Sequence, residues 1–228
     1  MSPTWMSAFL DLAPESYDAG VAFWQGVTGY GLSPSRGEYD EFATLVAPDG
    51  DDFLRVQRLG SGPSRLHLDV HASGHEFAIH TSPGGLAWCT VSHPAAIRPR
   101  AAAWPGGHRS VVDQVCLDIP SGRYGAECAF WSDLLGWGFE AARHPEFRRL
   151  HVPTDQPLRM LLQRLDEPDG PVRAHLDLAT DDRPAETERH VALGAEVVDS
   201  RPGWTVLRDP AGSAYCITDR DPDSGYGR

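Results

Sequence analysis

The sequence predicts an α+β fold built from paired βαβββ modules and arranged as two tandem halves. A Leu-Asp-aliphatic motif recurs four times, the two halves of the chain align residue by residue, and each half has the order strand, helix, strands. The motif stands at Leu10–Leu12, Leu68–Val70, Leu117–Ile119 and Leu176–Leu178. The spacing within the first pair nearly equals the spacing within the second, so each half is expected to hold two modules.

The alignment of the halves keeps one register over five separate motifs, which indicates an internal duplication. After His67 and His175 the register shifts, and the second half gains a segment the size of one helix with its loops. We therefore expect the second module of the first half to lack its helix. The aligned motifs are Ala22-Phe23-Trp24 with Ala129-Phe130-Trp131, Gly29-Tyr30-Gly31 with Gly136-Trp137-Gly138, Glu41-Phe42 with Glu146-Phe147, Gln57-Arg58-Leu59 with Gln163-Arg164-Leu165, and His67-Leu68-Asp69 with His175-Leu176-Asp177.

The elements follow from periodicity and turn signals. Tyr17, Val21 and Trp24 share one face of a helix predicted over 14–26, and Asp182 with Pro184 predicts the start of a helix that Gly194 ends. We expect halves at 1–95 and 111–220, a linker at 96–110 and a flexible tail at 221–228. Further strands are predicted over 7–12, 41–47, 53–59, 112–119, 147–152 and 159–165, with a helix over 122–135.

Composition narrows the classes of function. The 228 residues are 41% hydrophobic, carry a net charge of −12 and include no lysine, since all 20 basic residues are arginine. Lysine Schiff-base catalysis is excluded, and the acidic balance argues against nucleic-acid or membrane partners. With no apolar run of about 18 residues and no secretory leader, we expect a cytoplasmic protein whose four cysteines are free thiols.

The repeated βαβββ unit and the turn Leu207-Arg208-Asp209-Pro210-Ala211-Gly212 resemble the vicinal-oxygen-chelate (VOC) superfamily, which includes glyoxalase I, bleomycin-resistance proteins and extradiol dioxygenases. The resemblance covers nearly all of residues 5–219. It implies a cupped sheet in each half with a small-molecule cavity inside. It also implies a monomer that acts as a pseudo-dimer, because the second half takes the place of a partner chain.

Metalloenzymes of this superfamily use His and Glu ligands, and the resemblance carries these positions onto Gln114, Gln163, His175 and Cys216. The first half has Ser7, Gln57, His67 and Cys89 in the same order. Because neutral amides are poor ligands for hard divalent cations, no cofactor is expected, and a divalent metal would find a degenerate ligand set. Zinc could still bind if Asp118 or Asp177 joined His175 and Cys216.

The candidate site lies in the second half, where Gln114, Asp118, Gln163, His175 and Cys216 are expected to bind a ligand. His175 is interpreted as a hydrogen-bonded inward residue or as a general base, and Cys216 with His175 as a nucleophilic dyad or as a small apolar strand residue. Trp24, Tyr30, Trp131 and Trp137 are expected in the core.

Two functions remain open. One is metal-poor binding of a small organic molecule, aromatic or cationic, for sequestration or resistance. The acid-rich surface and the Asp-lined strands would suit a cationic guest. The other is a metal-free or weakly metal-dependent isomerase, lyase or cyclase that uses His175, with Gln114 and Gln163 donating to an oxyanion. Glyoxalase I activity is not expected without the carboxylates.

Overall fold

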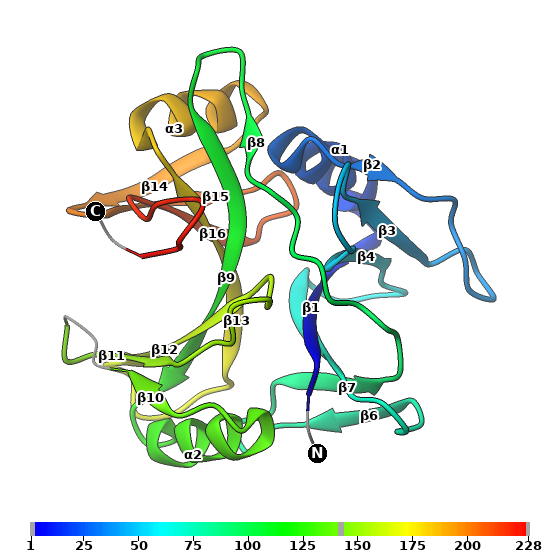
Figure 1. Ribbon diagram of the computed structural model, residues 1–228, viewed down its shortest axis with the longest axis vertical. Helices are drawn as coiled ribbons and strands as arrows, with labels where there is room; N and C mark the ends of the chain where they lie inside the picture. The colour runs from blue at the N-terminus through cyan, green and yellow to red at the C-terminus, as the bar shows by residue number, and fades with distance from the viewer. Residues whose placement is uncertain (1–2, 141–143, 227–228) are drawn as a thin grey trace.

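A computed structural model describes residues 3–140 and 144–226 and shows two mixed β-sheets with few helices (Figure 1). The first sheet has the order β2-β3-β4-β1-β5-β7-β6, and the second has the order β10-β11-β12-β9-β13-β16-β15-β14, with β8 paired to β9. Figure 1 shows the first half, in blue to cyan, beside the second half, in green to red. This is the paired-module α+β architecture that the repeat predicts.

The bounds of the elements are as follows. The first half contains β1 (Trp5–Leu12), the 3₁₀ turn η1 (Pro14–Ser16), α1 (Tyr17–Thr28), β2 (Gly31–Leu32), β3 (Phe42–Val46), β4 (Leu54–Arg58), β5 (Arg65–His71), β6 (Ala78–Thr81) and β7 (Ala87–Val91). The remainder contains β8 (Ala102–Ala103), β9 (Arg109–Pro120), α2 (Tyr124–Leu135), β10 (Phe139–Glu140), β11 (Phe147–Leu150), β12 (Arg159–Leu165), β13 (Arg173–Thr180), α3 (Arg183–Ala192), β14 (Glu196–Arg201), β15 (Trp204–Arg208) and β16 (Ala214–Thr218). None of the described helices is long and apolar enough to cross a membrane.

The helix ends show how local sequence sets the elements. The expected stop of α1 at Gly26 is two residues early, because the helix continues to Thr28 and closes at Gly29, which adopts the left-handed conformation with φ 73°. Gly136 closes α2 in the same way with φ 69°. Asp182 is the N-cap of α3, as predicted, and its side chain accepts a hydrogen bond from the Ala185 amide at 3.1 Å.

The second module of the first half is smaller than the other three. Residues 72–77 lead from β5 to β6 without a helix, and the module has three strands where its counterpart has four. The sequence predicted the loss of the helix from this module, but it did not predict the loss of one strand. The boundaries drawn from the sequence for halves, linker and tail stay a prediction.

The first helix of each half packs on the second module of the other half. The Trp24 ring of α1 lies 5.4 Å from the Tyr215 ring of β16, and the Trp131 ring of α2 lies 6.3 Å from the Trp88 ring of β7. In the sequence alignment Trp24 pairs with Trp131 and Tyr215 pairs with Trp88, so the two contacts correspond. Trp24, Tyr30, Trp131 and Trp137 are all buried in the hydrophobic core, as predicted.

Arg189 of α3 fastens the connection between the halves. Its guanidinium lies 3.5 Å from the centre of the Trp104 ring and donates hydrogen bonds to the carbonyl oxygens of Gly26 and Val27 at the end of α1. These bonds satisfy carbonyl groups that the helix leaves without intrahelical partners. Arg189 is itself held by the buried carboxylate of Glu186 at 2.7 Å.

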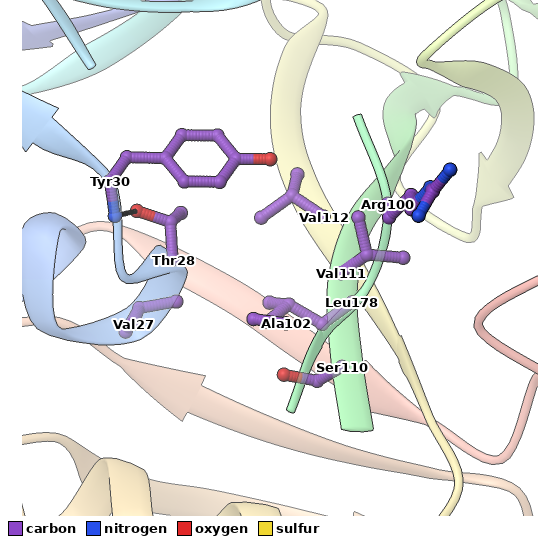
Figure 2. A pocket seen from close by; sticks show the side chains of 9 residues that line it. All are labelled: Val27, Thr28, Tyr30, Arg100, Ala102, Ser110, Val111, Val112 and Leu178. Atoms are coloured by element: carbon purple, nitrogen blue, oxygen red, sulfur yellow. Dashed lines mark hydrogen bonds between the residues drawn. The ribbon is translucent and has the colours of Figure 1, made fainter. Parts of the chain in front are cut away.

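A void of about 10 Å³ remains where α1, the linker and β9 meet (Figure 2). The Tyr30 amide donates to Thr28 Oγ1 at 3.1 Å, and Figure 2 shows the Tyr30 phenol pointing toward Val112. A space of this size holds one water molecule at most, so it belongs to the packing between the halves and not to a ligand site.

Candidate functional site

His175 stands at the centre of a buried polar cluster in the second sheet. It lies opposite Cys116 in the antiparallel pairing of β13 with β9, and side chains alternate along a strand, so Asp118 and Asp177 reach the same face. His175 Nδ1 lies 3.0 Å from Asp118 Oδ2, and its Nε2 lies 3.3 Å from Asp177 Oδ1 and 3.7 Å from the Cys216 sulfur. Both ring nitrogens therefore face carboxylates.

This arrangement favours the protonated imidazolium. Burial by itself lowers the pKa of His175, but contacts with Cys116, Asp118 and Asp177 outweigh burial and hold that pKa well above its usual value near 6.5. Burial likewise opposes the charge of Asp177, yet His175 and Arg220 keep the pKa of Asp177 below its ordinary value. His175 with its two carboxylates is thus a buried ionic cluster with no free imidazole lone pair.

The cysteines in the cluster are not activated. Burial and the charge of Asp177 raise the pKa of the Cys216 thiol, and burial raises the pKa of Cys116 to about 12. A nucleophilic cysteine needs the opposite shift. The geometry brings Cys216 next to His175, as the dyad hypothesis requires, without supplying a thiolate.

The two glutamines that the sequence singled out are also in the cluster, each with a protein partner. Gln114 Nε2 donates to Asp177 Oδ2 at 2.5 Å, and the Cys116 thiol donates to Gln163 Oε1 at 3.7 Å. All five predicted site residues therefore converge on one region. Their roles as ligand-binding residues stay a prediction.

Arg220 and Asp113 belong to the same cluster, and the sequence reading missed both. Asp113 is the extra residue of a β-bulge in β9, between Val112 and Gln114, which turns its carboxylate toward the cluster. The Arg220 guanidinium, from the segment after β16, bonds to Asp113 and lies 3.8 Å from Asp177 Oδ2. A prediction from regular alternation of side chains cannot place a bulged residue such as Asp113. No local sequence pattern indicates where the segment after the last strand, which holds Arg220, will pack.

The last described residues contact the second sheet, where a flexible tail was expected. Arg109 forms an ion pair with Asp223 at 3.0 Å, and the Arg159 guanidinium lies 4.3 Å from the centre of the Tyr226 ring. Arg220 is buried. Ionic and cation–π contacts of this kind need no apolar pattern, which explains why sequence periodicity gave no sign of them.

The first half contains a corresponding cluster around His67. His67 Nδ1 lies 2.9 Å from Asp11 Oδ1, and its Nε2 lies 3.9 Å from Asp69 Oδ1. The guanidinium of this cluster is that of Arg55 in β4. It donates to Ser7 Oγ at 2.9 Å and lies 3.6 Å from Asp69. Each half thus combines one histidine with a buried guanidinium and with aspartates, two in the first half and three in the second.

These residues do not fit a hard divalent cation. Of the four positions that the resemblance assigns to ligands, only His175 carries a strong ligand, and both of its nitrogens are engaged. The Arg220 guanidinium already supplies positive charge beside Asp177. His175, Asp177 and Cys216 offer ligand atoms within 4.8 Å of one another, and so do Cys116, Asp118 and His175, but closed zinc sites use four ligands.

An open cavity of about 740 Å³ lies between the halves, next to this cluster. Asp118 and His175 reach its wall, whereas Gln114, Gln163 and Cys216 are not among the residues that line it. This cavity takes walls from both halves and is not the one expected inside the second-half cup, which stays a prediction. It is lined by Leu10, Trp24, Pro63–Leu66, Gly85–Ala87, Asp118, Pro171–Leu176, Arg208 and Gly212–Ala214.

A family model described as a glyoxalase-like domain matches residues 7–84 and 114–218. The chain belongs to the glyoxalase-like domain family. The match covers both halves and confirms the resemblance to the VOC superfamily. No curated protein matches the sequence.

Solved structures of the superfamily share the fold of this glyoxalase-like protein. A Mn(II)-bound glyoxalase from Novosphingobium aromaticivorans is similar with 17% identity and a TM-score of 0.65, over 100% of this chain and 87% of that one. A mutant 4-hydroxymandelate synthase from Streptomyces coelicolor has 13% identity and a TM-score of 0.62, over 97% and 95% of the two chains. The 2,2',3-trihydroxybiphenyl 1,2-dioxygenase of Sphingomonas wittichii has 14% identity and a TM-score of 0.60, over 95% and 90%. At these identities the likeness shows the fold alone.

Proposed function

We propose that the protein binds a small organic molecule in the cavity between its halves, without a metal ion as the anchoring group. The cavity itself carries this proposal, because ligand sites in proteins measure roughly 300–1,000 Å³ and combine apolar walls with a few convergent polar groups. At about 740 Å³ the cavity falls within this range. Leucines and Trp24 supply apolar surface, and Asp118 with His175 supplies polar atoms.

The occupied ligand positions support binding without a metal. A divalent cation would have to displace His175 from Asp118 and Asp177 and compete with the positive charge of Arg220. An organic ligand in the cavity needs neither change. Sequestration or resistance is the biological role that such binding would serve.

The alternative function, a metal-free isomerase, lyase or cyclase, has weaker support. A general base needs an unprotonated lone pair within reach of the substrate, and both His175 nitrogens are engaged. The Gln114 amide donates to Asp177 and is not directed at an oxyanion. We therefore propose binding in preference to catalysis.

A thermal-shift screen of small organic molecules, run with and without EDTA, tests the proposal. A ligand of the cavity should raise the unfolding temperature increasingly with its concentration, by RT ln(1 + [L]/Kd) in free energy, and equally in EDTA. Ala214→Phe, which places a ring at the cavity wall, should abolish the shift, and Ala192→Phe on the exposed end of α3 should not.

A second comparison uses the two histidines. His175 lines the cavity and His67 is not part of its lining, so His175→Ala should reduce binding more than His67→Ala. A dependence of every ligand on added metal, or shifts that persist in Ala214→Phe, would contradict the proposal.

A further inference from the structure

We infer that the ligand of this cavity carries a carboxylate on an apolar body, and that Arg173 and Arg208 bind the carboxylate. The inference rests on the proposed function, since it names the chemical class of molecule that the cavity takes. Its evidence is the charge on the cavity wall and a difference between two aligned arginines.

The cavity is lined by equivalent segments of the two halves. Pro63–Leu66 aligns with Pro171–Ala174, and Gly85–Ala87 aligns with Gly212–Ala214. Each half thus contributes the start of its β5 or β13 strand and the start of its β7 or β16 strand. Arg65 and Arg173 occupy the same position in the two halves.

The wall is positively charged although the chain is acidic. The protein carries a net charge of −12, yet three arginines line the cavity against one carboxylate, that of Asp118. Asp118 Oδ2 lies 3.0 Å from His175 Nδ1, and none of the three arginines forms an ion pair with Asp118 within the part of the chain that the structure describes. The aspartates on the strands, which suggested a cationic guest, are paired inside the protein.

The aligned arginines differ in their partners. Arg65 Nε lies 3.2 Å from Asp11 Oδ2, so that its charge is balanced within the first half. Arg173 lies opposite Asp118 across β9 and β13, but it forms no ion pair with any residue that the structure describes. Of the two aligned arginines, Arg173 is therefore the one that can form an ion pair with a ligand.

Arg208 adds a second guanidinium to the part of the cavity wall that the second half contributes. Its Nη1 donates to the Gly212 carbonyl at 2.9 Å, and within residues 3–140 and 144–226 it forms no ion pair, although its charge acts on the buried carboxylate of Asp209. The aligned position in the first half is Thr81, which carries no charge. Guanidinium groups bind carboxylates through paired, charge-assisted hydrogen bonds, which makes an anionic group the natural partner for Arg173 and Arg208.

The remaining wall favours an apolar body. Trp24 lies in the wall, and its indole N–H is already bonded to Asp209 at 2.9 Å, so this residue offers the ligand no free donor. Apolar side chains complete the wall at Leu10, Leu66, Leu86, Val172 and Leu176. An aromatic or branched carboxylate matches both parts of this surface.

Isothermal titration calorimetry with 2-naphthoate and 2-naphthamide tests the inference, because the two probes share one shape and differ in charge. At low ionic strength the full-length protein should bind the acid at least about tenfold more tightly than the amide. Arg173→Gln and Arg208→Gln should each lower the affinity for the acid about tenfold and leave the affinity for the amide unchanged. Arg65→Gln is the matched control and should change the affinity for the acid less than about threefold.

The outcomes separate this inference from the proposed function. Equal binding of acid and amide, or an equal loss in Arg65→Gln and Arg173→Gln, would overturn the carboxylate assignment while leaving the cavity as a ligand site. No binding of either probe at millimolar concentration would also overturn the assignment, whereas the proposed function fails only if the unbiased screen finds no cavity ligand. Arg173 and Arg208 are exposed, and unchanged unfolding temperatures of their variants will show that they fold.

Discussion

Replacing Asp209 by Ala should destabilise the protein substantially, because one buried carboxylate joins the two halves. Asp209 Oδ2 accepts the indole N–H of Trp24 at 2.9 Å, and Oδ1 accepts the amides of Ala211 and Ser213 at 2.9 and 2.8 Å. The indole donor would be left buried and unpaired, at about 1–3 kcal/mol, while water can reach the two half-buried amides and reduce their cost to about 0.5 kcal/mol each. We expect a total loss of about 3 kcal/mol.

Urea denaturation followed by tryptophan fluorescence and far-UV circular dichroism measures this loss. The change should appear as a lower midpoint with an unchanged slope, and as a fall of about 6–12 °C in unfolding temperature. Asp199→Ala is the control, since it removes a surface carboxylate that pairs with Arg201 and accepts the neighbouring Ser200 amide, and it should leave the midpoint nearly unchanged.

A double-mutant cycle with Trp24→Phe isolates the bond between the halves. If Asp209 and Trp24 stabilise each other through this hydrogen bond, the double variant should lose about 1 kcal/mol less than the sum of the single variants. Additivity within about 0.3 kcal/mol would refute the reasoning.

Four further predictions concern the polar cluster, metals and assembly. Burial opposes the charge of His175, but contacts with Cys116, Asp118 and Asp177 raise its folded-state pKa well above the ordinary 6.5. Its stabilising contribution is therefore complete below pH 6.5 and is lost as the pH rises through the folded-state pKa. The free energy of unfolding should therefore fall from pH 6 toward pH 9 in urea titrations, with a smaller slope in His175→Gln. Cys116 and Cys216, whose thiol pKa values are raised by burial, should resist iodoacetamide at pH 7.5 until the protein unfolds; rapid labelling seen by mass spectrometry would count against the cluster as described. Dialysis against EDTA should leave the unfolding temperature unchanged, and titration with Mn²⁺ should show no stoichiometric uptake; tight binding of one ion would contradict the assigned ligand positions. Sedimentation should give a monomer of 24.9 kDa, and a stable dimer of whole chains would show that a second chain is still required.

The repeat in the sequence was enough to predict the fold, because side-chain periodicity and turn residues are local signals. The N-cap Asp182 and the four buried aromatic side chains followed from the same signals. The missing strand of the first half was not predicted, since the alignment only measured how many residues were absent. Local patterns predict that a module is present better than they predict how many strands the module contains.

The candidate site was predicted in part. The resemblance to the superfamily singled out Gln114 and His175, and the structure brings both together with Asp118 in one cluster. Arg220 and the bulged Asp113 could not be found, because one depends on where the chain end packs and the other on a break in the alternation. The cavity depends on how two halves dock, which no pattern within a half encodes.

The unequal pairing of Arg65 and Arg173 has a consequence for the kind of molecule that can be recognised. In a homodimer of identical subunits, a cavity on the symmetry axis must present every group twice, so that a ligand without symmetry binds in two equivalent orientations. In a single chain, each side of the cavity can change by itself. Here Arg65 on one side pairs with Asp11, whereas Arg173 on the other side has no ion pair among the described residues. This difference is enough to give a bound molecule a single orientation.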